Sequence, residues 1–121
     1  MTSVIAVVND LFFWTKILET AERLNVPLRL VRSPEELEAQ VRACRPALLI
    51  FDLNAETCQP LQAIRRMKAD PELKDIPALG FFSHVQHDLK AAATEAGCDR
   101  IMARSGFTAQ LPKILRPYAT P

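Results

Sequence analysis

The sequence predicts an α/β domain in which a parallel, doubly wound sheet lies between two layers of helices. Two observations predict it. Five short apolar runs alternate with segments whose apolar residues recur at helical spacing. One of these runs, 47–51, is apolar at every position, which is typical of a strand that helices cover on both faces. At 121 residues the chain is long enough for one core, so we expect a single domain over residues 1–121.

The first predicted strand, Ser3–Val8, is apolar and rich in β-branched residues. After it, five apolar residues share one helical face: Trp14, Ile17, Leu18, Ala21 and Leu24. Pro27 ends this helix, because the residue before a proline is pushed out of the α region. Leu28–Val31 then predicts the second strand.

Ser33 and the three residues after it give the clearest local signal. Ser33 is a good N-cap, Pro34 suits the first helical position, and Glu36 completes a capping box. We expect this helix to run to about Ala43. Three of its residues are expected to face inward: Leu37, Val41 and Cys44.

The apolar run at 47–51 is the predicted central strand, and it ends at Asp52. The helix after it has an apolar face formed by Leu61, Ile64 and Met67. Asp70, followed by a proline, ends that helix. Ala78–Phe82 predicts the fourth strand.

Ser83–Gln86 offers a second capping box. The helix that follows has one apolar side, formed by Leu89, Ala92, Ala93 and Ala96. Gly97 stands where a left-handed C-cap residue belongs, and Arg100–Ala103 predicts the fifth strand. A last helix is marked by Leu111, Ile114 and Leu115. We expect it to be short, because Pro112 and Pro117 bound it.

Composition excludes several classes of function. A net charge of +1 leaves no face obliged to be basic, so we expect no nucleic-acid binding. Three widely spaced cysteines fit neither a disulfide framework nor a metal site and indicate reduced thiols in a cytoplasm. The N-terminus lacks the basic region of a signal peptide, and no apolar run approaches the roughly 20 residues of a membrane span. We expect a cytoplasmic protein.

Five strand–helix units in this order imply right-handed crossovers. For a chain of this length we expect the flavodoxin-like strand order 2-1-3-4-5. The first and third strands are then neighbours, and Asn9, Asp10 and Asp52 meet at the carboxyl edge of the sheet. Open α/β sheets bind their ligands at that edge.

The polar residues at these strand ends resemble those of the receiver domains of two-component response regulators, the CheY-like superfamily. The resemblance covers the whole chain, and three tracts carry it further: DPELKDIPALGFFS, AGCD and IMARSGF. It implies that Asp52 is the phosphoacceptor, and that Asp10, Asp52 and the main-chain carbonyl of Asn54 hold Mg²⁺. It implies a histidine kinase or a downstream signalling protein as partner.

Three departures concern the metal, the cation and the loop of that site. Asn9 replaces one acidic residue of the pair, so the Mg²⁺ site loses a formal charge. At ~4 Å and an effective dielectric of ~20, that charge is worth several kcal/mol gross against a divalent ion. Arg104 stands where the family has lysine, and its planar fork cannot substitute as a point charge. Ser105-Gly106 then replace the proline that normally fixes the following loop before Phe107.

A further departure concerns the Ser or Thr at the end of the fourth strand, whose hydroxyl takes part in switching in receiver domains. Phe82 occupies the family's Ser/Thr position, and Ser83 comes one residue late. Strand alternation sends these two side chains in opposite directions. We expect Phe82 to face Asp52. Phosphorylation would then find no hydroxyl to draw toward Asp52, and the domain would stay in one fixed state.

Several of these residues also have a purely structural explanation. Ser83 could serve only as an N-cap, and Arg104 could simply be solvated. His84 and His87 are at helical spacing but have no third ligand nearby, so we expect them on the surface.

Four large apolar residues, Leu11-Phe12-Phe13-Trp14, follow the first strand, and one helical face cannot bury all four. We expect Trp14 and Leu11 to be buried in the core. We expect Phe12 or Phe13 to cap the pocket together with Phe82, or to offer an interface.

Three functions are open to the sequence. The first is an atypical stand-alone receiver, without an output domain and without enzymatic activity, that acts through protein–protein interaction. The second is a working phosphoacceptor that uses Asp52 and Mg²⁺. The third is a small enzyme or cofactor binder on the same fold. Against the third, the sequence has only three glycines and no phosphate-cradling loop.

Overall fold

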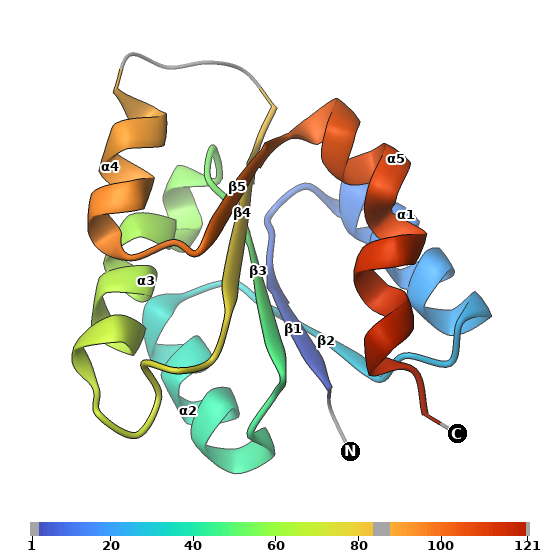
Figure 1. The fold of residues 1–121 in the computed structure, drawn as a ribbon, viewed down its shortest axis with the longest axis horizontal. Coiled ribbons are helices and arrows are strands. Elements are labelled where there is room, and N and C mark those ends of the chain that lie inside the picture. The colour runs from blue at the N-terminus through green and yellow to red at the C-terminus, as the bar shows by residue number, and fades with distance from the viewer. Residues whose placement is uncertain (1–2, 84–87, 121) are drawn as a thin grey trace.

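The computed structural model describes residues 3–83 and 88–120. Within them the five predicted strands pair as one parallel sheet in the order β2-β1-β3-β4-β5, which confirms the expected topology (Figure 1). The strands are β1 Val4–Val7, β2 Leu28–Val31, β3 Leu48–Asp52, β4 Ala78–Phe82 and β5 Arg100–Ala103. The helices are α1 Leu11–Arg23, α2 Pro34–Cys44, α3 Pro60–Ala69, α4 Leu89–Ala96 and α5 Arg104–Leu115, with short 3₁₀ turns at Glu56–Cys58 and Arg116–Tyr118.

Two helical layers cover the sheet (Figure 1). Helices α1 and α5 lie side by side on one face, and α2, α3 and α4 lie on the other. Every residue of β3 is buried, as its unbroken apolar run predicts. Alternate residues of β3 enter opposite layers: Leu48 and Ile50 pack toward α1 and α5, whereas Leu49 and Phe51 pack toward α2, α3 and α4.

The predicted caps of α2 and α4 are present in part. Ser33 Oγ accepts a hydrogen bond from the Glu36 amide at 3.1 Å, and Pro34 takes the first helical position. Gly97 ends α4 in the left-handed region, with φ +108°. There a Cβ would lie 2.7 Å from Cγ of Lys68, so glycine is also required for space. The capping box predicted at Ser83–Gln86 and the two histidines, 84 and 87, lie outside the described residues except for Ser83 itself.

The buried face of α1 is rotated from the predicted one. Phe13 is 2% exposed and belongs to the core, whereas Trp14 is only partly buried. Leu11 and Phe12 are 57% and 88% exposed, so assigning Leu11 to the core was wrong. The reason is that α1 begins directly after Asp10, which turns Phe13 and Ile17 toward the sheet.

The prediction that α5 is short was also wrong, because the helix runs for 12 residues with Pro112 inside it. A proline within a helix costs about 3 kcal/mol. Four buried side chains of α5 outweigh that cost, at about 1.5–3 kcal/mol each. They are Phe107, Leu111, Ile114 and Leu115.

Both ends of the described chain are attached near the start of β2. The Ser3 amide donates to the Pro27 carbonyl at 3.0 Å. The amide and hydroxyl of Thr120 both donate to the Asn25 carbonyl, at 2.8 and 3.0 Å. The two ends therefore lie at the amino-terminal edge of the sheet, opposite Asp52 (Figure 1). In the part of the chain that the structure describes, no helix has the length and apolar character needed to cross a bilayer.

Candidate functional site at the carboxyl edge of the sheet

Asp52 is the last residue of β3 and lies between the neighbouring strands β1 and β4. Alternation along β3 puts its side chain on the face covered by α1 and α5. The residue is only 8% exposed, and a carboxylate at that depth must be hydrogen-bonded. Oδ1 of Asp52 accepts the amide of Asn54 at 3.0 Å, which tightens the turn after the strand.

Asp10 serves as the N-cap of α1, a role that the sequence analysis did not assign to it. Its Oδ1 accepts the amides of Phe12 and Phe13, at 3.0 and 3.2 Å. These are two of the amides that a helix leaves without partners in its first turn. The cap therefore fixes the orientation of the carboxylate as well as the start of the helix.

Arg104 reaches the same carboxylate from the other end of the chain. It is the first residue of α5, and its Nη2 lies 3.4 Å from Oδ2 of Asp10. Its Cζ lies 4.1 Å from the centroid of the Phe13 ring, a cation–π arrangement. Both contacts contradict the alternative that Arg104 is simply solvated. Ser105 and Gly106 form the first turn of α5 and are no separate loop.

The Phe13 ring under Arg104 belongs to a cluster of three aromatic rings. Phe81 stacks on Phe107, with ring centroids 4.6 Å apart and planes 12° apart. Phe13 packs against both, at 4.9 Å from Phe81 and 5.9 Å from Phe107. The rings come from β4, α5 and α1, so they join three elements under the site. Phe13 therefore does not cap the pocket, contrary to one of our two expectations for it.

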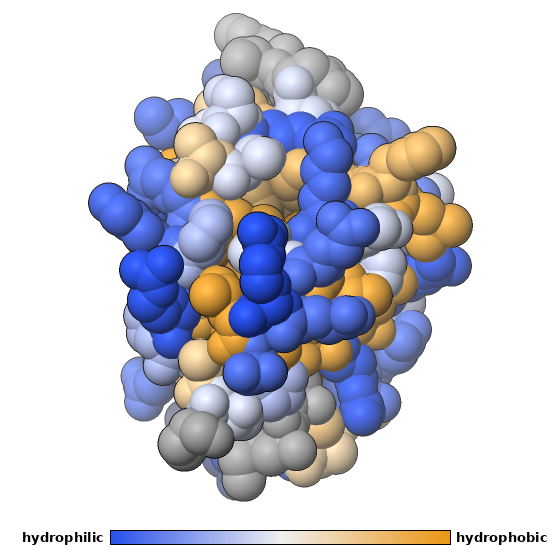
Figure 2. All heavy atoms as spheres, turned by 90° about the vertical axis from the view of Figure 1, so that its right-hand side faces the viewer, coloured by the Kyte–Doolittle hydropathy of each residue, from blue (hydrophilic) through white to orange (hydrophobic). Residues whose placement is uncertain are grey.

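The surface over α1 and α5 is mixed. Figure 2 faces this layer and shows hydrophobic patches among hydrophilic side chains. Among the described residues, Leu11 and Phe12 are the large hydrophobic side chains that stand exposed. They begin α1 and so flank Asp10.

The end of β4 carries Ser83, and not Phe82, to the Asp52 side. Register pairs Asp52 with Phe81, so Phe82 alternates to the opposite face of the sheet, contrary to our expectation. The Ser83 amide donates to Oδ1 of Asn54 at 2.7 Å, and the Ser83 hydroxyl donates to the same oxygen at 3.3 Å. The side chain of Asn54 thus joins the ends of β3 and β4.

Gly80 positions the turn that contains Asn54. A Cβ at Gly80 would lie 2.9 Å from Cδ1 of Leu53, so the absence of a side chain lets Leu53 pack flat on β4. The amide of Leu53 also donates to the Phe81 carbonyl at 2.8 Å. Both contacts hold Leu53, and with it the main chain directly after Asp52.

A strong divalent-metal site does not fit these residues. The carboxylate of Asp10 already caps α1 and faces Arg104, and Asn9 is an exposed amide where a third carboxylate would stand. The Asn54 carbonyl accepts the Glu56 amide at 3.0 Å. Two carboxylates and one guanidinium leave a single net negative charge, which is little for a Mg²⁺ ion. The described residues hold no group of three or more His, Cys, Asp or Glu side chains suited to a metal.

The two buried cysteines add no nucleophile. All three are free, and Cys58 and Cys98 are buried. Burial is the main cause that raises the pKa of both the Cys58 and Cys98 thiols above the ordinary value. A thiol in such surroundings is held in its unreactive protonated form.

No family model matches the chain, and no curated protein does. Solved structures match it over nearly its whole length. The phosphorylated cyanobacterial phytochrome response regulator RcpA has a TM-score of 0.78 at 23% identity, over 96% of this chain and 89% of its own. A response regulator from Hahella chejuensis has a TM-score of 0.83 at 16% identity, over 99% and 96%. The Mn²⁺-bound form of response regulator Rcp1 has a TM-score of 0.76 at 18% identity, over 97% and 91%. The chain therefore has the CheY-like fold of response-regulator receiver domains.

Proposed function

We propose that this chain is an atypical receiver module of two-component signalling that acts through protein–protein contacts from one fixed state. The observation that carries the proposal is the Arg104 guanidinium beside Asp10, at 3.4 Å. The resemblance to receiver domains implies that this carboxylate is a metal ligand. Here the protein supplies the positive charge from its own side chain.

The Arg104 charge affects metal binding at the site and adds little to the stability of the fold. The side chains of Arg104 and Asp10 are 35% and 42% exposed, and ion pairs this exposed contribute about 0–1 kcal/mol to folding. A fixed cation nevertheless repels an incoming divalent ion. Two unit charges at ~4 Å interact by about 4 kcal/mol gross at an effective dielectric of ~20, and a divalent ion doubles that figure. The ring of Phe13 under the guanidinium helps to keep that charge in place.

The second support is the engagement of the hydroxyl at the end of β4. Ser83 Oγ and the Ser83 amide both bond to Asn54 Oδ1. A receiver-type switch would require this serine to leave Asn54 and move toward Asp52. The aromatic contacts among Phe13, Phe81 and Phe107 oppose any accompanying shift of β4 relative to α1 and α5.

The partner we propose is a protein: a histidine kinase or a downstream signalling protein. Leu11 and Phe12 offer apolar surface beside the site, as protein contacts require. We propose neither nucleic-acid binding nor enzymatic turnover, and a cytoplasmic location stays a prediction from the reduced cysteines.

A working phosphoacceptor is the second candidate, and one observation favours it. Asp52 is the buried carboxylate at the carboxyl end of the central strand, where the resemblance puts the nucleophile. Ser83 on the Asp52 side, in place of Phe82, also removes the objection from the sequence that no hydroxyl would face Asp52.

Amide NMR with and without beryllofluoride and Mg²⁺ tests both functions. We expect no saturable shifts, because the site binds the metal poorly and Ser83 stays on Asn54. Asp52→Asn serves as the control, because it lacks the carboxylate on which the beryllofluoride adduct would form. Saturable shifts in wild type that spread into Ile101–Phe107 and α4, and that Asp52→Asn abolishes, would overturn the fixed state. Incubation with acetyl phosphate and Mg²⁺, followed by intact-mass measurement, tests the covalent step separately.

A further inference from the structure

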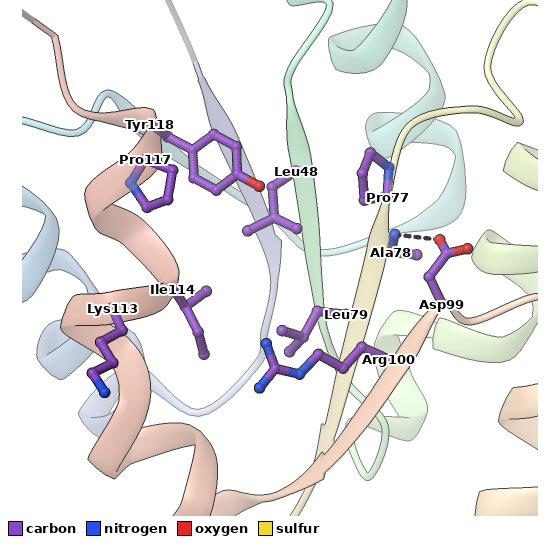
Figure 3. Close-up of a pocket in the computed structure, with 10 residues that line it drawn as sticks. All are labelled: Leu48, Pro77, Ala78, Leu79, Asp99, Arg100, Lys113, Ile114, Pro117 and Tyr118. Atoms are coloured by element: carbon purple, nitrogen blue, oxygen red, sulfur yellow. Dashed lines mark hydrogen bonds between the residues drawn. The ribbon is translucent and has the colours of Figure 1, made fainter.

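A second concave site lies at the opposite edge of the sheet from Asp52. It is a cavity of about 300 Å³ between the first residues of β3, β4 and β5 and the carboxyl end of α5 (Figure 3). None of the residues assigned to the carboxyl-edge site lines it. Its volume is at the lower limit of small-molecule sites, so its occupant is small.

The walls of the cavity are apolar on both sides. Leu48 and Leu79 line it from the sheet, and Ile114 faces them from α5 (Figure 3). Tyr118 closes one end with its ring, which lies toward Leu48 (Figure 3). This lining suits a hydrocarbon chain or a single ring.

Two cations stand at the cavity. Arg100 extends from β5 toward α5 and Ile114, whereas Lys113 lines the cavity from α5 with its ammonium directed away from Arg100 (Figure 3). Gln110 holds the guanidinium, since Arg100 Nη2 donates to its Oε1 at 3.1 Å. This bond uses one of the five N–H donors of a guanidinium and leaves the others for a ligand. Within the described residues, neither cation has an ion-pair partner.

Among the described residues of the lining, Asp99 is the acidic one, and it already has a cationic partner. Asp99 Oδ2 accepts a hydrogen bond from the Ala78 amide at 2.8 Å (Figure 3). The same oxygen accepts one from the Lys68 ammonium, also at 2.8 Å. Burial acts to raise the pKa of Asp99, but the bonds from Lys68 and Ala78 outweigh it and lower the pKa. The end of α5 adds about half a negative charge. Two full positive charges exceed that, so the cavity selects an anion.

We propose that this cavity binds a small amphipathic carboxylate, with its apolar body between the sheet and α5 and its carboxylate on Arg100, while Lys113 adds positive charge at the rim. The planar fork of Arg100 suits a carboxylate in a bidentate arrangement. The apolar lining disfavours a bare inorganic anion, which would leave Leu79 and Ile114 without contacts. The carboxylate site is independent of the chemistry at Asp52.

The test is a titration of the whole protein followed by amide NMR, with 3-phenylpropionate as the probe. Its neutral analogue, 3-phenylpropanamide, has the same shape without the charge, and inorganic phosphate has charge without the apolar body. We expect saturable shifts at Leu79, Arg100, Ile114 and Tyr118 with the acid. We expect 3-phenylpropanamide and inorganic phosphate to bind at least about tenfold more weakly than the acid.

Two variants refine the test. Arg100→Gln is expected to weaken the binding of 3-phenylpropionate about tenfold and to leave the affinity for 3-phenylpropanamide unchanged. The reason is that it removes the charge and leaves the apolar lining in place. Lys90→Gln, on the exposed side of α4, removes the same charge elsewhere and is expected to change neither affinity. Equal affinities for the acid and the amide overturn the proposal. So do shifts that gather at the Asp52 edge, an equal loss in Lys90→Gln, or no saturable shift with the acid.

Discussion

Nη2 of Arg104 lies 3.4 Å from Oδ2 of Asp10, across 94 positions of sequence. The contact joins the residue that starts α5 to the residue that caps α1. One carboxylate thus performs two tasks, because Oδ1 satisfies helix amides while Oδ2 meets the guanidinium. The start of two helices and the charge of the candidate site therefore depend on the same side chain.

The capping role of Asp10 predicts a stability cost that depends on the substituent. Asp10→Ala removes both amide bonds and is expected to lower the free energy of unfolding by about 1 kcal/mol. Asp10→Asn keeps an oxygen acceptor for the cap and is expected to cost less, although it loses the attraction to Arg104. Urea denaturation measures both, with Asp75→Ala at an exposed position as the control. Equal midpoints for Asp10→Ala and Asp75→Ala would contradict the cap.

The cation at the site predicts weak Mg²⁺ binding with two separable causes. Asn9→Asp adds a carboxylate and Arg104→Ala removes the competing charge, so each is expected to raise the Mg²⁺ affinity. The double variant is expected to bind at least about tenfold more tightly than wild type, which is ~1.4 kcal/mol. Calorimetry or Trp14 fluorescence measures the affinity, and Arg23→Ala, remote from the site at the end of α1, is the control. Equal affinities for wild type and Asn9→Asp would show that Asn9 is not the limiting defect.

The contact between Leu53 and β4 predicts a cost for the smallest possible change at Gly80. In Gly80→Ala the new methyl meets Leu53 at about the 2.9 Å of the ideal position, so Leu53 must move. We expect a loss of about 1–3 kcal/mol from overpacking, and altered amide shifts at Asn54 and Ser83. Leu53→Ala on the same background makes room and is expected to be less costly there than in the wild type. Additive costs would rule out the contact as the cause.

The ion pair of Lys68 and Asp99 predicts acid sensitivity. Because the pKa of Asp99 is lowered in the folded state, its carboxylate stabilises the fold above the unfolded pKa of about 3.9. That contribution is lost as the pH falls through the lower folded value. The stability difference between wild type and Asp99→Asn should therefore be constant near neutral pH and shrink below about pH 4. Urea midpoints against pH check this, and an unchanged difference in acid would contradict it.

The fold could be predicted from the sequence because burial patterns are local. The unbroken apolar run before Asp52 and the Ser33 capping signal each specify an element without information from distant residues. The alternation of strands and helices then implied right-handed crossovers, and the chain length favoured the flavodoxin-like strand order. The same reasoning brought Asp10 and Asp52 to neighbouring strands.

The site could be predicted only in outline, because its contacts are tertiary. The pairing of Arg104 with Asp10 and the ring of Phe13 depends on where α5 begins, which no local signal marks. The side-chain role of Asn54 was missed because the resemblance drew attention to its carbonyl. One available signal was overlooked: an Asp directly before a helical apolar run is a good N-cap, and it would have assigned Asp10.

The attachment of both chain ends near β2 has a practical consequence. Thr120 is bonded to the Asn25 carbonyl at the edge of the sheet that lies farthest from Asp52. A tether joined at either end therefore leaves from the amino-terminal edge. An immobilised or fused domain would turn Asp10, Arg104 and the exposed Phe12 outward, away from the support. Surface-capture experiments with a terminal tag would leave the carboxyl edge of the sheet accessible to an incoming protein. The tether itself would run close to the cavity beside Arg100.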